Sequence, residues 1–396
     1  MKFKSVFFKK WVSFLFVASP ILAMYGINLS TVTLLDFLLV ITIMTLLLLY
    51  GKEIKFNRME ISLIIIIFLI FLNYFFNLYF FQENYIGIFL RTFRLCFYLL
   101  AIVIGSKFVD MGYGIKYYRF FSVFAIFYLI IQYILLIFFD YSLKGYIDFL
   151  PVMRQELISF TENLRFSSIA RPRSIFNEPS QIGLYVSGYL ALSVFYHEIN
   201  DKRILQFFLT IGLLLTASTT AIFSGALIWG FYLIYFWKKT VLNFIALLGW
   251  LSSLLVLILT SSRITLFIGR LPSSLSNRLE GFIDYFYNFK EMSIVNILFG
   301  NGMNLEALDA WYSGFMKIFY YYGILGMCIF IMFLVCLYIQ AANRATKLYI
   351  LIFFALGVFS ELFVSNWLLI YIPFILQGKY IITNKQINKS CCKGAT

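Results

Sequence analysis

Long apolar stretches alternate with short polar connections along this chain. A helix needs roughly 17–25 apolar residues to cross about 30 Å of hydrocarbon, and nine stretches are that long. They are residues 11–28, 31–50, 60–81, 86–105, 120–139, 180–197, 220–237, 241–260 and 313–339. The pattern therefore predicts an all-α protein that crosses a membrane many times.

Shorter apolar stretches add three more helices. Residues 204–217 form one short run, and residues 348–382 are long enough for two short helices that turn near residues 361–366. The first run follows four lysines like a signal peptide, but a second run follows at once, so we expect it to be retained. The pattern predicts about twelve transmembrane helices (roughly 10–12), with residues 1–396 as a single integral membrane domain.

The composition agrees with a membrane protein. The 396 residues are 62% hydrophobic and only 13% charged, with a mean hydropathy of +0.89. Soluble domains carry about 25% charged residues, so a water-soluble globular protein is excluded. The five cysteines have neither a disulfide-framework nor a metal-ligand spacing, and we expect no metal site and no cofactor.

The basic residues predict the orientation. Of the 32 Lys+Arg, 20 lie in the N-terminal arm, in alternate connections and in the C-terminal tail. Cytoplasmic connections carry such an excess, which puts both termini in the cytoplasm. The net charge of +14 then reflects sorting across the membrane, and we expect no nucleic-acid partner.

Two long connections fall on the outer side, residues 140–179 and residues 261–312. Loops of this length are usually functional. The inner segments hold 16 Lys and 4 Arg, whereas the two loops hold 2 Lys and 7 Arg. Arginine grips phosphate through a planar fork of donors, so an anionic ligand is expected for some of the seven. The alternative is that they pair with acidic residues of the same loops. The seven are Arg154, Arg165, Arg171, Arg173, Arg263, Arg270 and Arg278.

Five ionisable residues lie in the outer parts of the apolar runs: Asp36, Arg91, Arg94, Lys317 and Glu361. A charge in the membrane costs about 2.5–3.5 kcal/mol, so it normally faces a cavity or a partner. We expect a polar cavity that opens outward, with two of the arginines on one helix face because they are three residues apart. The alternative is snorkelling to the headgroups.

The sharpest local motif is RPRSIFNEPS at residues 171–180, followed by Gln181-Ile182-Gly183. Pro179 with Glu178 before it predicts a helix start, and the positive end of that helix can help to bind an anion. A plain helix cap is the alternative. At these residues the chain resembles the Wzy family of bacterial polysaccharide repeat-unit polymerases, within the O-antigen polymerase and ligase superfamily.

Other segments share the resemblance. Residues 298–302 (LFGNG) resemble a Leu-x-Gly-x-Gly motif of that family, and residues 322–326 (YGILG) resemble its Tyr-Gly-Ile-x-Gly. Residues 215–220 (LTASTT) are similar to its Thr-x-Ser-Arg-x turn, although Thr219 replaces the arginine. Arg270 stands eleven positions before a glycine, as in an Arg-x10-Gly pattern of some members.

The resemblance implies a function at the outer face of the bacterial cytoplasmic membrane. Such an enzyme moves a glycan from an undecaprenyl-pyrophosphate-linked donor onto a lipid-linked acceptor, to make O-antigen, capsular or exopolysaccharide. Partner proteins would be a flippase and a chain-length regulator. The implied catalytic residues are Arg173 and Glu178, as stabiliser of the leaving pyrophosphate and as base for the acceptor hydroxyl. The implied substrate-binding residues are Arg171, Arg91, Arg94, Arg263, Arg270, Arg278 and Lys317.

Three other functions are alternatives to a polymerase. An O-antigen ligase shares the architecture, but ligases of the superfamily use a histidine in the large outer loop, and neither long loop here contains one. A flippase for lipid-linked oligosaccharide would place arginines near mid-depth and would not need two long outer loops. A small-solute transporter would place charge at mid-membrane.

The predicted orientation can be tested with fusions to a side-specific reporter. We expect a reporter fused after Asp148 or after Asn288 to be active outside, and one fused after Lys239 to be active inside, because the basic connections stay in the cytoplasm. Reporter activity on the opposite sides would refute the orientation.

Overall fold

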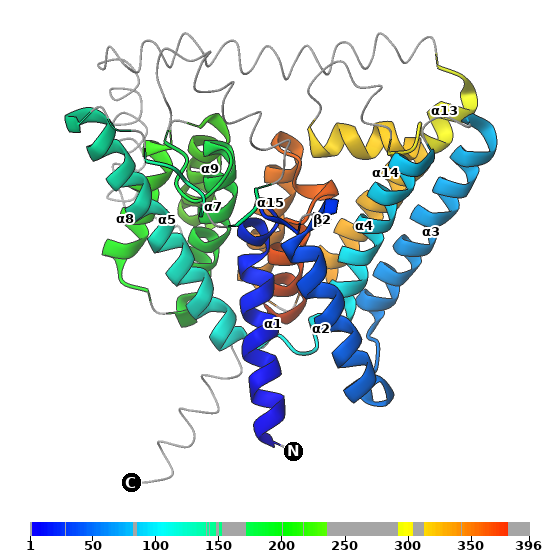
Figure 1. The fold of residues 1–396 in the computed structure, drawn as a ribbon, viewed down its shortest axis with the longest axis horizontal. Helices are drawn as coiled ribbons and strands as arrows, with labels where there is room; N and C mark the ends of the chain where they lie inside the picture. The colour runs from blue at the N-terminus through cyan, green and yellow to red at the C-terminus, as the bar shows by residue number, and fades with distance from the viewer. Residues whose placement is uncertain are drawn as a thin grey trace.

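The computed structural model shows a bundle of helices (Figure 1). The described residues are 2–27, 29–81, 85–139, 141, 143–147, 150–152, 172–199, 201–216, 218–235, 292–303, 313–341 and 343–378. The α-helices are α1 (Lys2–Leu22), α2 (Leu34–Tyr50), α3 (Arg58–Phe81), α4 (Tyr85–Gly105), α5 (Met111–Phe139), α7 (Pro179–Phe195), α8 (Arg203–Leu215), α9 (Thr219–Tyr235), α13 (Ile294–Phe299), α14 (Gly314–Gln340), α15 (Arg344–Phe359) and a last helix, Leu368–Gly378. Single 3-10 turns are η1 (Gly51–Glu53), η2 (His197–Ile199) and η3 (Leu362–Val364).

The described helices follow the predicted apolar runs. Within the described residues, five of them are long and apolar enough to cross a bilayer, namely α2, α3, α4, α5 and α14, while α8, α9 and the last helix are apolar but shorter. The helical pair expected in 348–382 is α15 and the last helix, with η3 at the turn. The predicted runs at 11–28, 180–197 and 220–237 correspond to α1, α7 and α9, which are not among these five helices. The run at 241–260 lies outside the described residues, so the count of twelve spans stays a prediction.

The helices alternate in direction between two ends of the bundle (Figure 1). The N-terminus lies at the lower end, together with the connections from α2 to α3 and from α4 to α5, whereas α4 and α7 begin at the upper end. The two ends are called the lower end and the upper end, as they lie in Figure 1. The lysine-rich connections thus share an end with the N-terminus, as the charge pattern predicts; that this end faces the cytoplasm stays a prediction.

Helix α7 forms the centre of one half of the bundle. Its residues 182–195 are all buried, and it packs against α5, α8, α9 and α15. Gly183 allows a close approach, since a Cβ atom there would lie 2.6 Å from the Cβ of Ala221 in α9. The hydroxyls of Ser187 and Ser224 also hydrogen-bond across this contact. Small residues of this kind let membrane helices pack closely.

A short β-hairpin follows α1 and was not predicted, because the apolar run at 31–50 suggested helix from its start. Strands β1 (Gly26–Ile27) and β2 (Leu29–Thr33) pair antiparallel. The hairpin also reaches the first long loop, where the amide of Gly26 donates to the carbonyl oxygen of Pro151 at 2.7 Å and Tyr25 bridges to Val152. The hairpin therefore anchors part of that loop to the end of α1.

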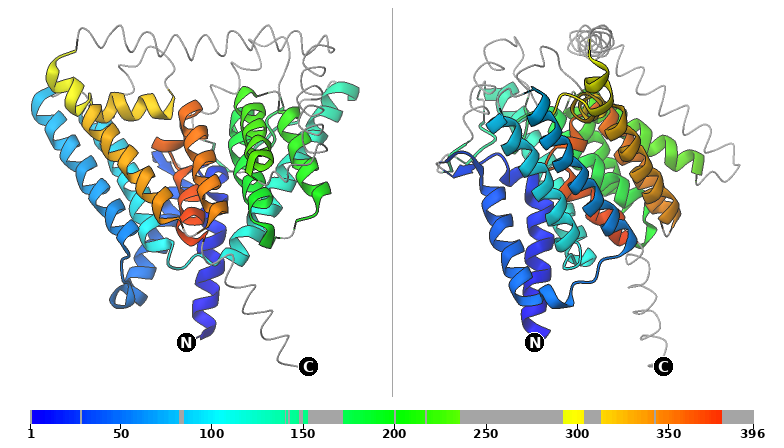
Figure 2. Two further views of the ribbon diagram at one scale, coloured as in Figure 1. Left: turned by 180° about the vertical axis from the view of Figure 1, so that it is seen from behind. Right: turned by 90° about the vertical axis from the view of Figure 1, so that its right-hand side faces the viewer.

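Helix α14 is broken at Gly323, where φ is 65° and ψ is −166°. Its first arm lies across the upper end of the bundle, and its second arm runs down beside α3 and α4 (Figures 1 and 2). The amides of Asn301 and Gly302 donate to the carbonyl oxygens of Tyr320 and Tyr321 at 2.9 and 3.1 Å. These bonds replace helical bonds that the break removes.

Three glycines make this junction possible, and we call Gly300, Gly302 and Gly323 the glycine joint. All three have positive φ, a conformation that glycine adopts without steric cost. A Cβ atom at Gly300 would collide with the backbone of Tyr321, and one at Gly323 would collide with the carbonyl of Leu298. Residues 298–302 and 322–326, two separate motifs in the sequence, are thus in direct contact.

The helix α13 in the second long loop was not predicted.

We expect Gly323→Ala to destabilise the protein strongly, because alanine at positive φ costs about 1–3 kcal/mol and its methyl group would collide with Leu298. Thermal aggregation in detergent, followed by size-exclusion chromatography, should show a loss of several degrees. Gly230→Ala in α9 is the matched control, since nothing lies within 4 Å of a Cβ atom there. Equal stability of the two variants would refute the role of the joint.

Candidate functional site

The segment that enters α7 is fixed by buried residues. Ser174 has a left-handed backbone (φ 54°). Its amide donates to Gln132 Oε1 at 2.7 Å, and its hydroxyl donates to the carbonyl oxygen of Ala125 at 2.6 Å. Phe176, which is 1% exposed, stacks near the ring of Trp367. The segment is therefore held between α5 and the start of the last helix.

Arg173 and Glu178 lie on this fixed segment at the upper end of α7. The Arg173 guanidinium donates to the carbonyl oxygen of Asn177 at 2.7 Å. Glu178 occupies the N-cap position and is exposed, and its carboxylate accepts from the Ser180 hydroxyl at 2.9 Å. Pro179 occupies the first turn as predicted. A cation and a carboxylate thus stand together beside a positive helix end, where an anion is favoured.

Arg94 is paired with Asp36 of α2. Arg94 Nε lies 3.3 Å from Asp36 Oδ2. The same carboxylate accepts from the Tyr98 hydroxyl at 2.7 Å and from the Thr33 amide at 3.0 Å, in a capping box that starts α2. This network satisfies a buried carboxylate in the apolar bundle. A phosphate ligand at Arg94 would have to compete with Asp36.

A second polar group, the upper cluster, consists of Arg91, Lys317, Tyr321 and Glu361. Lys317 Nζ lies 2.6 Å from Glu361 Oε1, and the side chains are 9% and 48% exposed, respectively. Tyr321 follows Lys317 by four residues on the same arm of α14 and is 1% exposed. The Arg91 guanidinium donates to the carbonyl oxygen of Met303 at 3.2 Å, next to the glycine joint. The cluster therefore links α4, α14 and the turn after α15.

The five ionisable residues all lie toward one end of the bundle, the upper end, as predicted. Four of them form ion pairs with one another: Asp36 with Arg94, and Lys317 with Glu361. Arg91 and Arg94 share one helix and still turn to different partners. The charges balance locally, so their presence in the bundle does not itself require a ligand.

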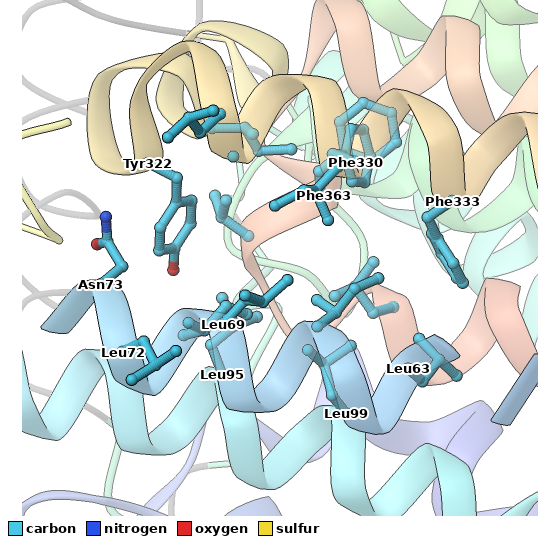
Figure 3. Close-up of a pocket in the computed structure, with 18 of the residues that line it drawn as sticks. Leu63, Leu69, Leu72, Asn73, Leu95, Leu99, Tyr322, Phe330, Phe333 and Phe363 are labelled. Carbon is cyan, nitrogen blue, oxygen red and sulfur yellow. The ribbon is translucent and has the colours of Figure 1, made fainter. Parts of the chain in front are cut away.

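An apolar cavity lies between α3, α4 and α14 (Figure 3). Its volume is about 460 Å³. None of the five ionisable residues lines it, and its polar side chains are Asn73 and Tyr322. This apolar cavity is therefore not the polar cavity that the sequence led us to expect, and the polar cavity stays a prediction.

Four of the predicted substrate-binding residues lie outside the described residues: Arg171, Arg263, Arg270 and Arg278. Their relation to Arg173 and to the upper cluster stays a prediction.

Comparison with protein-family models finds no family that matches the chain, and comparison with curated proteins finds no match either.

Sequence reasoning missed the amide side chains of α3. Asn73 donates to the carbonyl oxygen of Phe299, and Asn77 donates to Asn73 at 2.9 and 3.1 Å. These bonds tie α3 to the glycine joint. The available signal was a pair of amides four residues apart, and so on one helix face, inside an otherwise apolar run.

The Lys317–Glu361 pair predicts a non-additive pair of substitutions. Glu361→Gln leaves a buried ammonium group without its carboxylate and should destabilise the protein, whereas Lys317→Met combined with Glu361→Gln should recover part of the loss. Because Glu361 is half exposed, we expect a coupling of about 1 kcal/mol by SDS-titrated unfolding in mixed micelles. Strictly additive effects would contradict this pairing.

Proposed function

We propose that this chain is a membrane glycosyltransferase that polymerises undecaprenyl-pyrophosphate-linked oligosaccharide units at the outer face of the bacterial cytoplasmic membrane. One observation carries the proposal: two of the segments that resemble the Wzy family, residues 298–302 and 322–326, form a single joint beside the upper cluster. Motifs that had no necessary relation in the sequence are thus parts of one structural unit. The Arg173–Glu178 segment opens at the same end of the bundle.

The proposed reaction joins a sugar hydroxyl to the anomeric carbon of the donor glycan. A bond from the hydroxyl oxygen to that carbon forms, the bond from the carbon to the pyrophosphate oxygen breaks, and undecaprenyl pyrophosphate leaves. The hydroxyl proton passes to a base, for which we propose Glu178 because its carboxylate is exposed at the helix start. Arg173 would stabilise charge on the leaving pyrophosphate. This chemistry needs no nucleotide and no cofactor.

The remaining predicted residues have distinct proposed roles. Arg91, beside the joint, and Arg171, Arg270 or Arg278 of the loops would bind the pyrophosphate of donor or acceptor. Arg94 and Lys317 have carboxylate partners, so a role in substrate binding would require an exchange of partners. For them a structural role is the competing interpretation.

Ligase and flippase are the competing functions. The single histidine, His197, lies in η2, which follows α7 at the lower end, and so belongs to neither long loop. A ligase that relies on a loop histidine is disfavoured for this reason. For a flippase, charge at mid-depth is expected, whereas the described ionisable side chains of α2, α4 and α14 lie toward the upper end.

A strain that lacks the gene distinguishes these functions by gel analysis of surface and lipid-linked glycan. Single repeat units at the surface without a polymer ladder would support a polymerase. Long polymer retained on the lipid carrier would indicate a ligase, and repeat units held on the cytoplasmic side would indicate a flippase. An unchanged glycan profile would refute all three.

Substitutions then test the site. We expect Arg173→Ala and Glu178→Ala each to reduce polymer at least about 100-fold, because charge stabilisation and base catalysis each contribute factors of roughly that size. Arg203→Ala and Glu53→Ala are matched controls at the lower end and should leave the ladder intact. Membrane levels are compared by immunoblot. A normal ladder from either site variant would remove that residue from the proposed mechanism.

A further inference from the structure

The apolar cavity between α3, α4 and α14 contains an unsatisfied hydrogen-bonding group. Tyr322 is the last residue of the first arm of α14 and is 9% exposed, and its hydroxyl has no hydrogen-bond partner among the described residues. In Figure 3 its ring reaches from α14 into the space above α3 and α4, near Leu69 and Leu72. A buried hydroxyl without a partner costs about 1–3 kcal/mol, so something that enters the cavity can regain that energy.

The rest of the lining is hydrocarbon. Aliphatic and aromatic side chains come from α3, α4 and both arms of α14, and also from α13, α15, η3 and the last helix. Cavities lined in this way stay free of water, so water is a poor partner for the Tyr322 hydroxyl. The occupant that fits is an apolar chain that carries one hydrogen-bond acceptor.

Part of the cavity lining lies at the surface of the bundle. Two of its lining residues, Leu72 and Leu325, are 47% and 44% exposed and form the rim between α3 and α14. Beside them the surface of α3 is also apolar, with Ile65 and Phe68 52% and 61% exposed. A hydrocarbon chain can therefore enter sideways from the membrane without crossing a polar surface.

The charges decide which kind of lipid fits. No charged side chain lines the cavity within the described residues, and its two polar side chains are the neutral Asn73 and Tyr322. One N–H of the Asn73 amide group donates to the carbonyl oxygen of Phe299, whereas the Tyr322 hydroxyl has no partner among the described residues. A phosphate would call for a cation, whereas the ester carbonyl of a fatty-acyl chain is a neutral acceptor that suits one hydroxyl.

We propose that the cavity binds one fatty-acyl chain of a bilayer glycerolipid, which enters between α3 and α14 and whose ester carbonyl accepts a hydrogen bond from the Tyr322 hydroxyl. The chain fills the gap between the α3–α4 pair and the second arm of α14. The lipid is a structural ligand of the bundle and not a substrate, and the proposal does not depend on the polymerase function.

The test uses the full-length protein in vesicles of phosphatidylethanolamine and phosphatidylglycerol. A small fraction of the phosphatidylglycerol carries a diazirine in one acyl chain, and light-induced adducts are mapped by mass spectrometry. We expect adducts at cavity residues of α3 and α14. Two tryptophan substitutions that fill the cavity, Leu69→Trp and Ile329→Trp, should lower labelling there at least fivefold.

Matched control variants distinguish filling of the cavity from a general loss of structure. Ile65→Trp and Met332→Trp place the same side chain on the same helices at exposed positions outside the cavity lining, and labelling should be unchanged. Tyr322→Phe keeps the ring and removes the hydroxyl, so the lipid loses one hydrogen bond. The fraction of labelled lipid that gives half-maximal labelling should therefore rise about three- to tenfold.

Three results would overturn the proposal. Equal labelling of the cavity-filling variants and their controls would show that the adducts come from the outer surface. An unchanged half-maximal fraction in Tyr322→Phe would remove the hydrogen bond. Protection of the cavity by polyprenyl phosphate, but not by unlabelled phosphatidylglycerol, would assign it to the glycan carrier instead. Because labelling requires no glycan, none of these results depends on whether the chain polymerises glycan.

Discussion

The break in α14 at Gly323 determines the arrangement of the upper end. In a bilayer each backbone polar group has to find its partner within the protein, so a broken helix is stable only where other groups replace the lost bonds. The amides of Asn301 and Gly302 do this for Tyr320 and Tyr321. With the break satisfied, the first arm can lie across the bundle, which brings Lys317 to Glu361 and directs Tyr322 into the cavity.

The upper end is divided into two chemically different regions. The Asp36–Arg94 pair and the upper cluster hold the guanidinium, ammonium and carboxylate groups, which are paired with one another or with a backbone oxygen. The cavity between α3, α4 and α14 offers hydrocarbon and two neutral polar side chains, Asn73 and Tyr322. A lipid-linked glycan has the same division, with a charged head and an apolar tail. Under the proposed function, the charged head would bind near the upper cluster while a bilayer lipid would occupy the apolar cavity.

The helices could be predicted because apolar runs of fixed length have few other solutions in a membrane. The start of α7 was predicted from Pro179, and the hairpin of α15 with the last helix from a polar interruption in a long run. The β-hairpin was missed because strand and helix are both compatible with a short apolar stretch. Other contacts join residues roughly 20 to 60 positions apart in the sequence. They are the glycine joint and the Asp36–Arg94 and Lys317–Glu361 pairs. Such contacts are set by the packing of the whole bundle, so one sequence alone could not identify the partners. Both catalytic candidates are described, yet four arginines named with them are not, and their part of the site stays a prediction.

The contact between the β-hairpin and the first long loop limits how modular that loop is. Gly26 and Tyr25 pair with the backbone at Pro151 and Val152, and the Tyr25 hydroxyl accepts from the amide of Ile147 at 3.2 Å. The loop thus has an attachment point more than a hundred residues away in the sequence. An exchange of residues 140–179 alone for the loop of another chain would break these contacts. Residues 23–33 therefore have to be exchanged together with the loop.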